Sequence, residues 1–152
     1  MAKVSVSSTQ LFSVAADVGT VFALLADVPA SAAHFEGLAE LVDKGDNTYC
    51  WNMDEMGAMG ITHQVVYTSK YISDEAAGTI EWIPVAGGNS EIAGSWKLTD
   101  NGNGTDLVFT TSGELEVPVP RLMAKMARGV VQGQFDDQLD TYLGNLKTAF
   151  AG

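Results

Sequence analysis

The chain has 152 residues, and 19 acidic against 8 basic residues give it a formal net charge of −11. Nucleic acids and anionic membranes would repel so acidic a protein, and its basic residues are spread along the sequence rather than clustered. We therefore expect no nucleic-acid partner and no stable insertion into a membrane. A chain of this length is most simply a single domain over residues 1–152, with a core that needs no disulfide or metal.

The sequence also indicates a compartment. Cys50 is the only cysteine and cannot form an internal disulfide, which favours a reducing environment. The first residues alternate apolar and polar side chains, whereas a secretory signal needs an unbroken apolar core of about 7 to 15 residues. No stretch approaches the roughly 18 consecutive apolar residues of a membrane span. We expect a cytoplasmic protein.

The chain is predicted to open with one strand and two short helices. Residues 3–14 alternate apolar and polar side chains, which predicts the strand. Asp17 is a suitable N-cap for a helix, and Pro29 ends that helix soon after Asp27. A further helical turn is expected over residues 30–35.

Residues 38–117 alternate with a period of two, which predicts a run of antiparallel strands joined by hairpins. The glycines and asparagines of the segment TDNGNGTD supply the positive φ angles of a tight turn between the last two strands. Another hairpin is expected to turn around Gly57. That turn would place His63 opposite Trp51 or Met53 on the neighbouring strand.

The last predicted element is a long helix over residues 121–150, after the extended segment VPVP. At about 100° per residue, its apolar side chains form two stripes that lie about 160° apart. The first stripe is Leu122, Met123, Met126, Ala127 and Val130, and the second is Phe135, Leu139, Tyr142, Leu146 and Phe150. One straight helix cannot bury both stripes. Gly129 and Gly133 lie where the stripe changes sides, and each costs the helix about 1 kcal/mol relative to alanine. We therefore predict a kink or a close backbone approach at these glycines.

Three stretches of this sequence resemble motifs of the START-like, helix-grip superfamily. VFALLADVPASAAHFEGL looks like the family's short helix and Phe-x-Gly turn, GSWKLTDNGNGTDLVF like its Gly-x-Trp strand before a Gly-Thr turn, and YLGNLKTAF like the end of its lid helix. The superfamily includes polyketide cyclases, lipid-transport domains, the major birch pollen allergen and accessory proteins of carbon monoxide dehydrogenase. The resemblance covers the whole chain and implies an α+β fold, in which a seven-stranded curved antiparallel sheet wraps around the long C-terminal helix. It also implies a hydrophobic cavity between sheet and helix.

The inward faces of the predicted strands and helix supply large, soft side chains for such a cavity. We predict that the ligand-binding residues are Trp51, Met53, Ile61, Val65, Tyr67, Trp82, Trp96, Phe109, Met123, Met126 and Val130. Methionine adapts to irregular shapes, which suits a lid over a flexible ligand. We expect Met126 and Trp51 to face a shared cavity of roughly 300 to 1,000 Å³.

Few polar residues are candidates for chemistry. Strand alternation places His63 on the face of Tyr67, where it could act as a general base with the tyrosine as hydrogen-bond donor, or could be a structural histidine bonded to a neighbour. His34, in a predicted loop near Glu36, is a weaker candidate. Two histidines and one cysteine without close spacing give no zinc site, and no nucleotide-binding motif occurs, so we expect neither metal nor cofactor.

Three functions remain open from the sequence. The first is non-catalytic binding or transport of a hydrophobic small molecule, such as a lipid, an isoprenoid or a polyketide. The second is a cyclase or dehydratase, and the third is an assembly or maturation factor resembling the carbon monoxide dehydrogenase accessory proteins. The scarcity of ionisable residues on the cavity-facing positions favours binding over catalysis. The oligomeric state cannot be read from the sequence.

Overall fold

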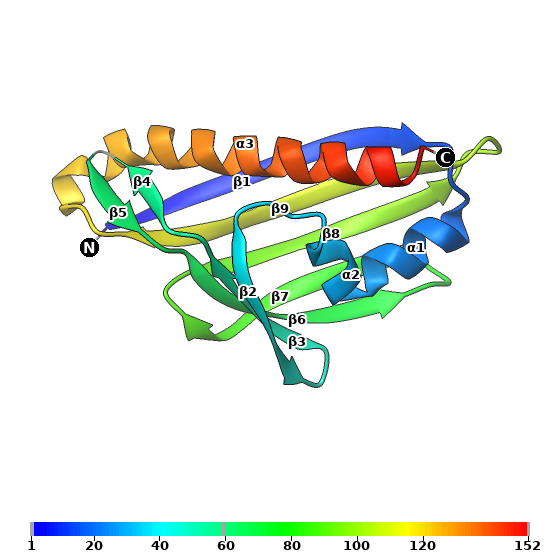
Figure 1. The fold of residues 1–152 in the computed structure, drawn as a ribbon, viewed down its shortest axis with the longest axis horizontal. Helices are drawn as coiled ribbons and strands as arrows, with labels where there is room; N and C mark the ends of the chain where they lie inside the picture. The colour runs from blue at the N-terminus through cyan, green and yellow to red at the C-terminus, as the bar shows by residue number, and fades with distance from the viewer. Residues whose placement is uncertain (1, 59, 152) are drawn as a thin grey trace.

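Figure 1 shows the computed structural model of the protein, which describes residues 2–58 and 60–151. Seven strands form one antiparallel sheet in the order β1-β9-β8-β7-β6-β3-β2. They are β1 (Ala2–Val14), β2 (Leu38–Gly45), β3 (Thr48–Met53), β6 (Val66–Asp74), β7 (Thr79–Gly88), β8 (Glu91–Asp100) and β9 (Thr105–Val117). The helices are α1 (Val18–Ala26), α2 (Val28–Ala32) and α3 (Ala124–Ala149), with a 3-10 turn, η1 (Arg121–Met123), before α3. A separate two-stranded sheet consists of β4 (Met56–Ala58) and β5 (Ile61–His63).

This architecture confirms the predicted α+β helix-grip fold. α3 extends lengthwise beside β1 and covers one face of the main sheet, and α1 and α2 lie near the other end of the molecule from the start of α3 (Figure 1). Most of the buried apolar residues belong to one cluster that joins the sheet, α1 and α3. None of the helices in the described part of the chain is long and apolar enough to cross a membrane.

Aspartates at two caps explain why α1 and α2 follow β1 so closely. The Asp17 carboxylate accepts hydrogen bonds from the amide and the hydroxyl of Thr20, at 3.3 and 2.6 Å. Asp27 ends α1, and its carboxylate accepts a bond from the amide of Ala30 at 3.2 Å, so α2 begins at once. The predicted cap at Asp17 is confirmed. The break between the two helices turns the buried side chain of Ser31 toward α3.

The predicted hairpin around Gly57 has the wrong pairing. β3 pairs with β6, which places Trp51 opposite Tyr67, and His63 lies on the β4–β5 hairpin opposite Met56. Gly57 itself lies within β4. His63 is therefore not opposite Trp51 or Met53.

Side-chain and backbone hydrogen bonds hold this extra hairpin between β3 and β6. The Met53 amide donates to the Val65 carbonyl at 3.0 Å, and the Gln64 side chain donates to the Met53 carbonyl at 2.8 Å. The Asp54 amide turns away and donates to the Gly37 carbonyl at 2.7 Å. Extended structure is thus interrupted on both sides of β4 and β5, and strand parity cannot be counted across the interruption.

α3 is one unbroken helix, and it buries a single stripe. Ala127 and Val131 pack inward near its start, in line with Leu139 and Leu146 further along. The first predicted stripe is therefore largely not buried: Leu122, Met126 and Val130 are exposed, by 99%, 66% and 41%. Ala127 is only 1% exposed, so the side of the helix that carries it faces the core and the side that carries Met126 faces outward.

The predicted close backbone approach at Gly129 and Gly133 is wrong. A Cβ atom added at either position would meet no atom of the described chain within 4 Å. A close approach does occur at glycines of the sheet, among them Gly94 in β8, where a Cβ would collide with the ring of Trp82 and with the carbonyl of Thr110. The glycine of the Gly-x-Trp motif therefore makes room for an aromatic ring on the inner face of the sheet.

Candidate functional site: an aromatic cavity under the helix

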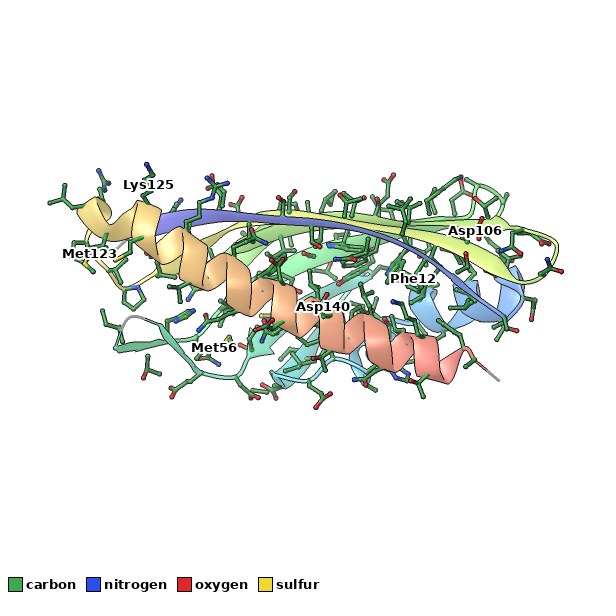
Figure 2. All side chains as sticks on the ribbon, turned by 90° about the horizontal axis from the view of Figure 1, so that it is seen from above. Phe12, Met56, Asp106, Met123, Lys125 and Asp140 are labelled. Carbon is green, nitrogen blue, oxygen red and sulfur yellow. The ribbon has the colours of Figure 1, made fainter. Side chains whose placement is uncertain are left out.

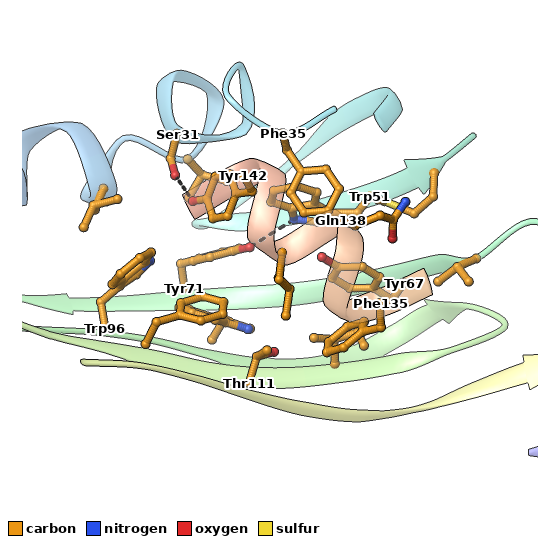
Figure 3. Close-up of a pocket in the computed structure, with 18 of the residues that line it drawn as sticks. Ser31, Phe35, Trp51, Tyr67, Tyr71, Trp96, Thr111, Phe135, Gln138 and Tyr142 are labelled. Atoms are coloured by element: carbon orange, nitrogen blue, oxygen red, sulfur yellow. Dashed lines mark hydrogen bonds between the residues drawn. The ribbon is translucent and has the colours of Figure 1, made fainter. Parts of the chain in front are cut away.

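A cavity of about 90 Å³ lies between the main sheet and the C-terminal half of α3 (Figure 3). Aromatic rings from the sheet, α3 and the loop after α2 form much of its wall: Phe35, Trp51, Tyr67, Tyr71, Trp82, Trp96, Phe109, Phe135 and Tyr142. All three tryptophans of the chain are among them. The predicted position between sheet and helix is correct, but the volume is below the expected range of roughly 300 to 1,000 Å³.

The rings form ordered contacts. Trp51 on β3 and Tyr67 on β6 are stacked, with centroids 5.8 Å apart and planes inclined by only 8°. Phe35 meets Trp51 edge to face at 5.9 Å, and Trp96 lies 4.7 Å from Phe109. The cross-strand register explains the Trp51–Tyr67 stack, since directly opposite residues on antiparallel strands bring their side chains together. A planar apolar group would find flat walls here.

Two hydrogen bonds fix polar atoms of the wall. Trp51 Nε1 donates to the Tyr71 hydroxyl at 3.0 Å, and the hydroxyls of Ser31 and Tyr142 lie 2.5 Å apart (Figure 3). The second bond connects α2 to α3 across the cavity. Both pairs satisfy groups that would otherwise be unpaired in an apolar environment.

Two polar groups of the wall remain available to a ligand. The Tyr67 hydroxyl makes no hydrogen bond with any described residue, and neither does the side-chain oxygen of Gln138. The Gln138 amide nitrogen contacts Met56 Sδ at 3.6 Å. Tyr67 can therefore donate to a ligand oxygen, and Gln138 can accept a hydrogen bond from a ligand.

The lining is nearly without acid–base chemistry. Burial raises the pKa of Tyr67 well above its ordinary value and raises that of Tyr142 to about 12. Burial also raises the pKa of Tyr71, and the nearby Tyr142 adds to the shift. All three phenols are therefore protonated near neutral pH and act as donors rather than bases. No carboxylate, imidazole, thiol or amine is found among the described lining residues.

His63 lies outside this cavity. It is 7% exposed on β5, and its Nδ1 atom is buried without a hydrogen-bond partner in the described chain. Burial lowers the pKa of the imidazole, and the backbone of Met56 opposes this shift. Neutral imidazole is favoured, but the ring is not among the groups that line the cavity. His34 does not line the cavity either.

The structure brings seven of the predicted ligand-binding residues to the cavity wall and places four elsewhere. The wall contains Trp51, Met53, Val65, Tyr67, Trp82, Trp96 and Phe109, but not Ile61, Met123, Met126 and Val130. The prediction that Met126 faces the cavity is wrong because the first half of α3 packs directly on β1, where Gln132 exchanges hydrogen bonds with both the amide and the carbonyl of Ser7, at 3.1 and 2.9 Å. Ile61 lies on the separate β4–β5 hairpin and is not part of the cavity wall.

The residues of α3 and α2 that line the wall are not among those predicted. Phe135, Gln138, Leu139 and Tyr142 line the cavity from α3. Their i, i+3, i+4, i+7 spacing is the signal that could have identified them, since it places all four on one helix face. No comparable signal pointed to Ser31, which depends on the break between α1 and α2.

The cover of the cavity is held by polar side chains of α3. Gln134 Nε2 donates to the Gly57 carbonyl at 2.5 Å, which fastens the β4–β5 hairpin to the helix. Asn145 Nδ2 donates to the His34 carbonyl at 2.9 Å and to the Glu36 carboxylate at 3.2 Å, which fastens the loop after α2. No group of three or more potential metal ligands occurs in residues 2–58 and 60–151.

A sheet that grips a long helix around an apolar cavity defines a START-like domain. Residues 1–150 match the family described as polyketide cyclase/dehydrase and lipid transport, and the chain belongs to this family. The predicted resemblance is confirmed. A search of curated proteins found no match to this chain.

Solved structures have the same fold at low sequence identity. The protein TTHA0849 from Thermus thermophilus is 18% identical with a TM-score of 0.67, over 95% of this chain and 94% of that one. The Zhui aromatase/cyclase from a Streptomyces species is 17% identical with a TM-score of 0.60, over 97% and 91%. A START superfamily protein from Mycobacterium smegmatis is 14% identical with a TM-score of 0.62, over 96% of both chains. Similarity at this level shows the fold alone.

Proposed function

We propose that the protein binds and carries a hydrophobic small molecule of lipid, isoprenoid or polyketide type without transforming it. The observation that supports this proposal best is the composition of the cavity wall. It combines aromatic and aliphatic side chains with a few hydroxyl and amide groups, and its phenols are protonated near neutral pH. Such a wall excludes water and orients a ligand, but its described lining residues include no general base.

The wall also indicates the character of the ligand. The stacked pair of Trp51 and Tyr67 favours a flat, unsaturated segment. The unpaired hydroxyl of Tyr67 favours a carbonyl or another acceptor near that segment, and Gln138 favours a hydroxyl nearby. We expect a largely apolar molecule with one or two oxygen functions and no net charge, because a buried charge would have no partner here.

The size of the cavity requires that binding enlarges it. An engineered cavity of about 150 Å³ accepts benzene, so about 90 Å³ is too small for a lipid. Phe35 lines both this cavity and a more open groove of about 380 Å³ between α2, β2 and β3. A rotation of Phe35 would join the two spaces. Met56 can also move with little cost, since methionine is flexible and its contact with Gln138 is weak.

Two measurements test the carrier function. Native mass spectrometry of freshly purified protein, followed by organic extraction, identifies a co-purified ligand. Because all three tryptophans line the cavity, titration with an uncharged polyene or aromatic probe is expected to change intrinsic fluorescence. Val65→Phe, which fills the cavity, is expected to abolish the change, whereas Ile83→Phe, at a position 44% exposed on β7, is expected to preserve it. Equal binding by both variants would contradict the proposed site.

A cyclase is the second candidate, because the chain belongs to a family whose description includes cyclases and because Tyr67 could donate a hydrogen bond to a developing enolate. His63 has no part in this version, since it lies outside the cavity. Incubation of the protein with linear polyketide analogues distinguishes the candidates. Cyclised product that is lost in Tyr67→Phe would support the enzyme, and recovery of unchanged ligand would support the carrier.

A further inference from the structure

The outward face of α3 has an unusual composition. Leu122, Met126, Gly129, Gly133, Asp136 and Asp140 follow one another at alternating spacings of four and three, which places them on one exposed ridge that begins in η1. Leu122 is 99% exposed and Met126 is 66% exposed. Two apolar side chains of this size, one helical turn apart, are seldom left so exposed unless another molecule covers them.

The glycines on this ridge have no role within one chain. Added Cβ atoms at Gly129 and Gly133 would project into open space, with no described atom within 4 Å. Each glycine costs the helix about 1 kcal/mol relative to alanine. A helix surface with glycines four residues apart allows another backbone to approach closely, as small residues do in packed helix pairs.

The charges on the exposed surface of this helix change sign along its length, and Lys125, Asp136 and Asp140 lie within about 60° of the ridge. Arg121, Lys125 and Arg128 lie before the glycines, with no acidic residue between them. Asp136, Asp137 and Asp140 lie after the glycines, with no basic residue between them. Figure 2 labels Lys125 and Asp140, one residue of each sign.

None of these six charged groups forms an ion pair within the described chain. The described residues contain one ion pair, Lys70 with Asp46, which lies elsewhere. Asp136 accepts a hydrogen bond from the neutral side chain of Gln132 at 2.8 Å, which fixes its carboxylate and leaves its charge uncompensated. The basic residues that seemed spread along the sequence therefore include a local group of three on one short stretch of helix surface.

We propose that this face pairs with the same face of a second copy of the chain, with the two α3 helices antiparallel about a two-fold axis. The glycines Gly129 and Gly133 are centred on residue 131, and the midpoint between Lys125 and Asp136 lies within one residue of that level. An axis that passes between the two helices at this level brings their glycines together and places Lys125 of each copy level with Asp136 of the other.

The helical positions of the two charges fit this arrangement. Lys125 and Asp136 lie only about 20° apart around the helix axis, so both are on the same side of the ridge. A two-fold axis perpendicular to both helices places this side of one ridge beside the same side of the other. Lys125 of one copy therefore faces Asp136 of the other copy. Each dimer then contains two such Lys125–Asp136 pairs, one on either side of the axis.

The distribution of charge selects a second copy over an anionic membrane. Three aspartates follow Leu122 and Met126 on the same face, and the whole chain has a net charge of −11, so an anionic bilayer would repel the face it contacts. Contact with a bilayer also does not require the close backbone approach that glycines on a helix allow. A self-complementary pattern of charge, by contrast, is what an isologous interface requires.

Sedimentation velocity of the full chain over a wide concentration range tests the pairing. The wild type is expected to form a species of twice the 16.1 kDa chain mass. Lys125→Asp is expected to weaken dimerisation roughly tenfold or more, because it opposes Asp136 twice in each dimer, and Asp136→Lys is expected to do the same. The double variant Lys125→Asp/Asp136→Lys restores opposite charges and is expected to recover the dimer. Lys44→Asp, which makes the same charge change on exposed β2, is expected to have no effect.

A second variant separates packing from charge. Gly133→Leu is expected to be monomeric, while its circular dichroism and thermal stability stay at or above wild type, because an added Cβ meets no described atom of its own chain. A monomeric wild type at all concentrations would overturn the proposal. The proposal would also be overturned if the double charge variant dimerised no more strongly than the single variants, or if Lys44→Asp weakened dimerisation as much as Lys125→Asp. A monomer that binds phosphatidylserine vesicles through Leu122 and Met126 would overturn it as well.

Discussion

The hydrogen bond between Ser31 and Tyr142 is expected to hold α2 and α3 together, and its removal should cost most when one hydroxyl is left buried without its partner. Both residues are 6% exposed, and the two oxygens are 2.5 Å apart. Tyr142→Phe leaves the Ser31 hydroxyl buried without its partner, and Ser31→Ala does the same to the tyrosine. An orphaned buried hydroxyl costs about 1 to 3 kcal/mol. For a domain of this size, that cost corresponds to a decrease in Tm of about 2 to 12 °C.

The double variant Ser31→Ala/Tyr142→Phe shows whether the two hydroxyls depend on each other. It removes both hydroxyls and leaves no orphan, so its loss in free energy of unfolding is expected to be clearly smaller than the sum of the two single losses. Urea denaturation followed by circular dichroism measures all four proteins, with ligand removed beforehand. If the two losses add to within about 0.5 kcal/mol, the hydroxyls do not interact and the reasoning is refuted.

Three further predictions concern other parts of the molecule. His63→Phe is expected to leave probe binding unchanged. It is also expected to remove a loss of stability that the wild type shows as pH falls below about 6.5, because the lowered pKa of the buried imidazole makes the unfolded chain bind the proton better than the folded chain does. Denaturation at about pH 5 to 8 measures this, and the same pH dependence in both proteins would contradict it. Gly144→Ala is expected to raise the free energy of unfolding by up to about 1 kcal/mol, since its Cβ meets no described atom within 4 Å, and a decrease would mean that an unseen contact occupies the site. Phe35→Ala is expected to speed probe entry in stopped-flow fluorescence, with Phe12→Ala as the matched control away from the lining; equal entry rates in both would show that Phe35 does not separate the groove from the cavity.

Local patterns in the sequence were sufficient to predict the elements of this fold. Asp17 acts as the predicted cap, the period of two over residues 38–117 corresponds to strands, and the apolar stripe from Phe135 to Phe150 faces the core. These features depend on interactions between residues close in sequence, or on alternation within one strand. The order of these elements and three motif-like stretches were then enough to identify the START-like family, which implied a cavity between sheet and helix.

Contacts between distant segments decided the site itself. His63 does not lie on the predicted face because β4 and β5 form their own hairpin. No sequence pattern within residues 54–65 predicts that the strand is interrupted there. Met126 is exposed because Ala127 and Val131 are the side chains that α3 buries in the core, which sets the rotation of the helix about its axis. A helix with two apolar stripes can bury either one, and only the shape of the surface it packs against determines the choice. The same rotation brought Gln138 and Tyr142 over the cavity and left the charged groups of α3 on the outside.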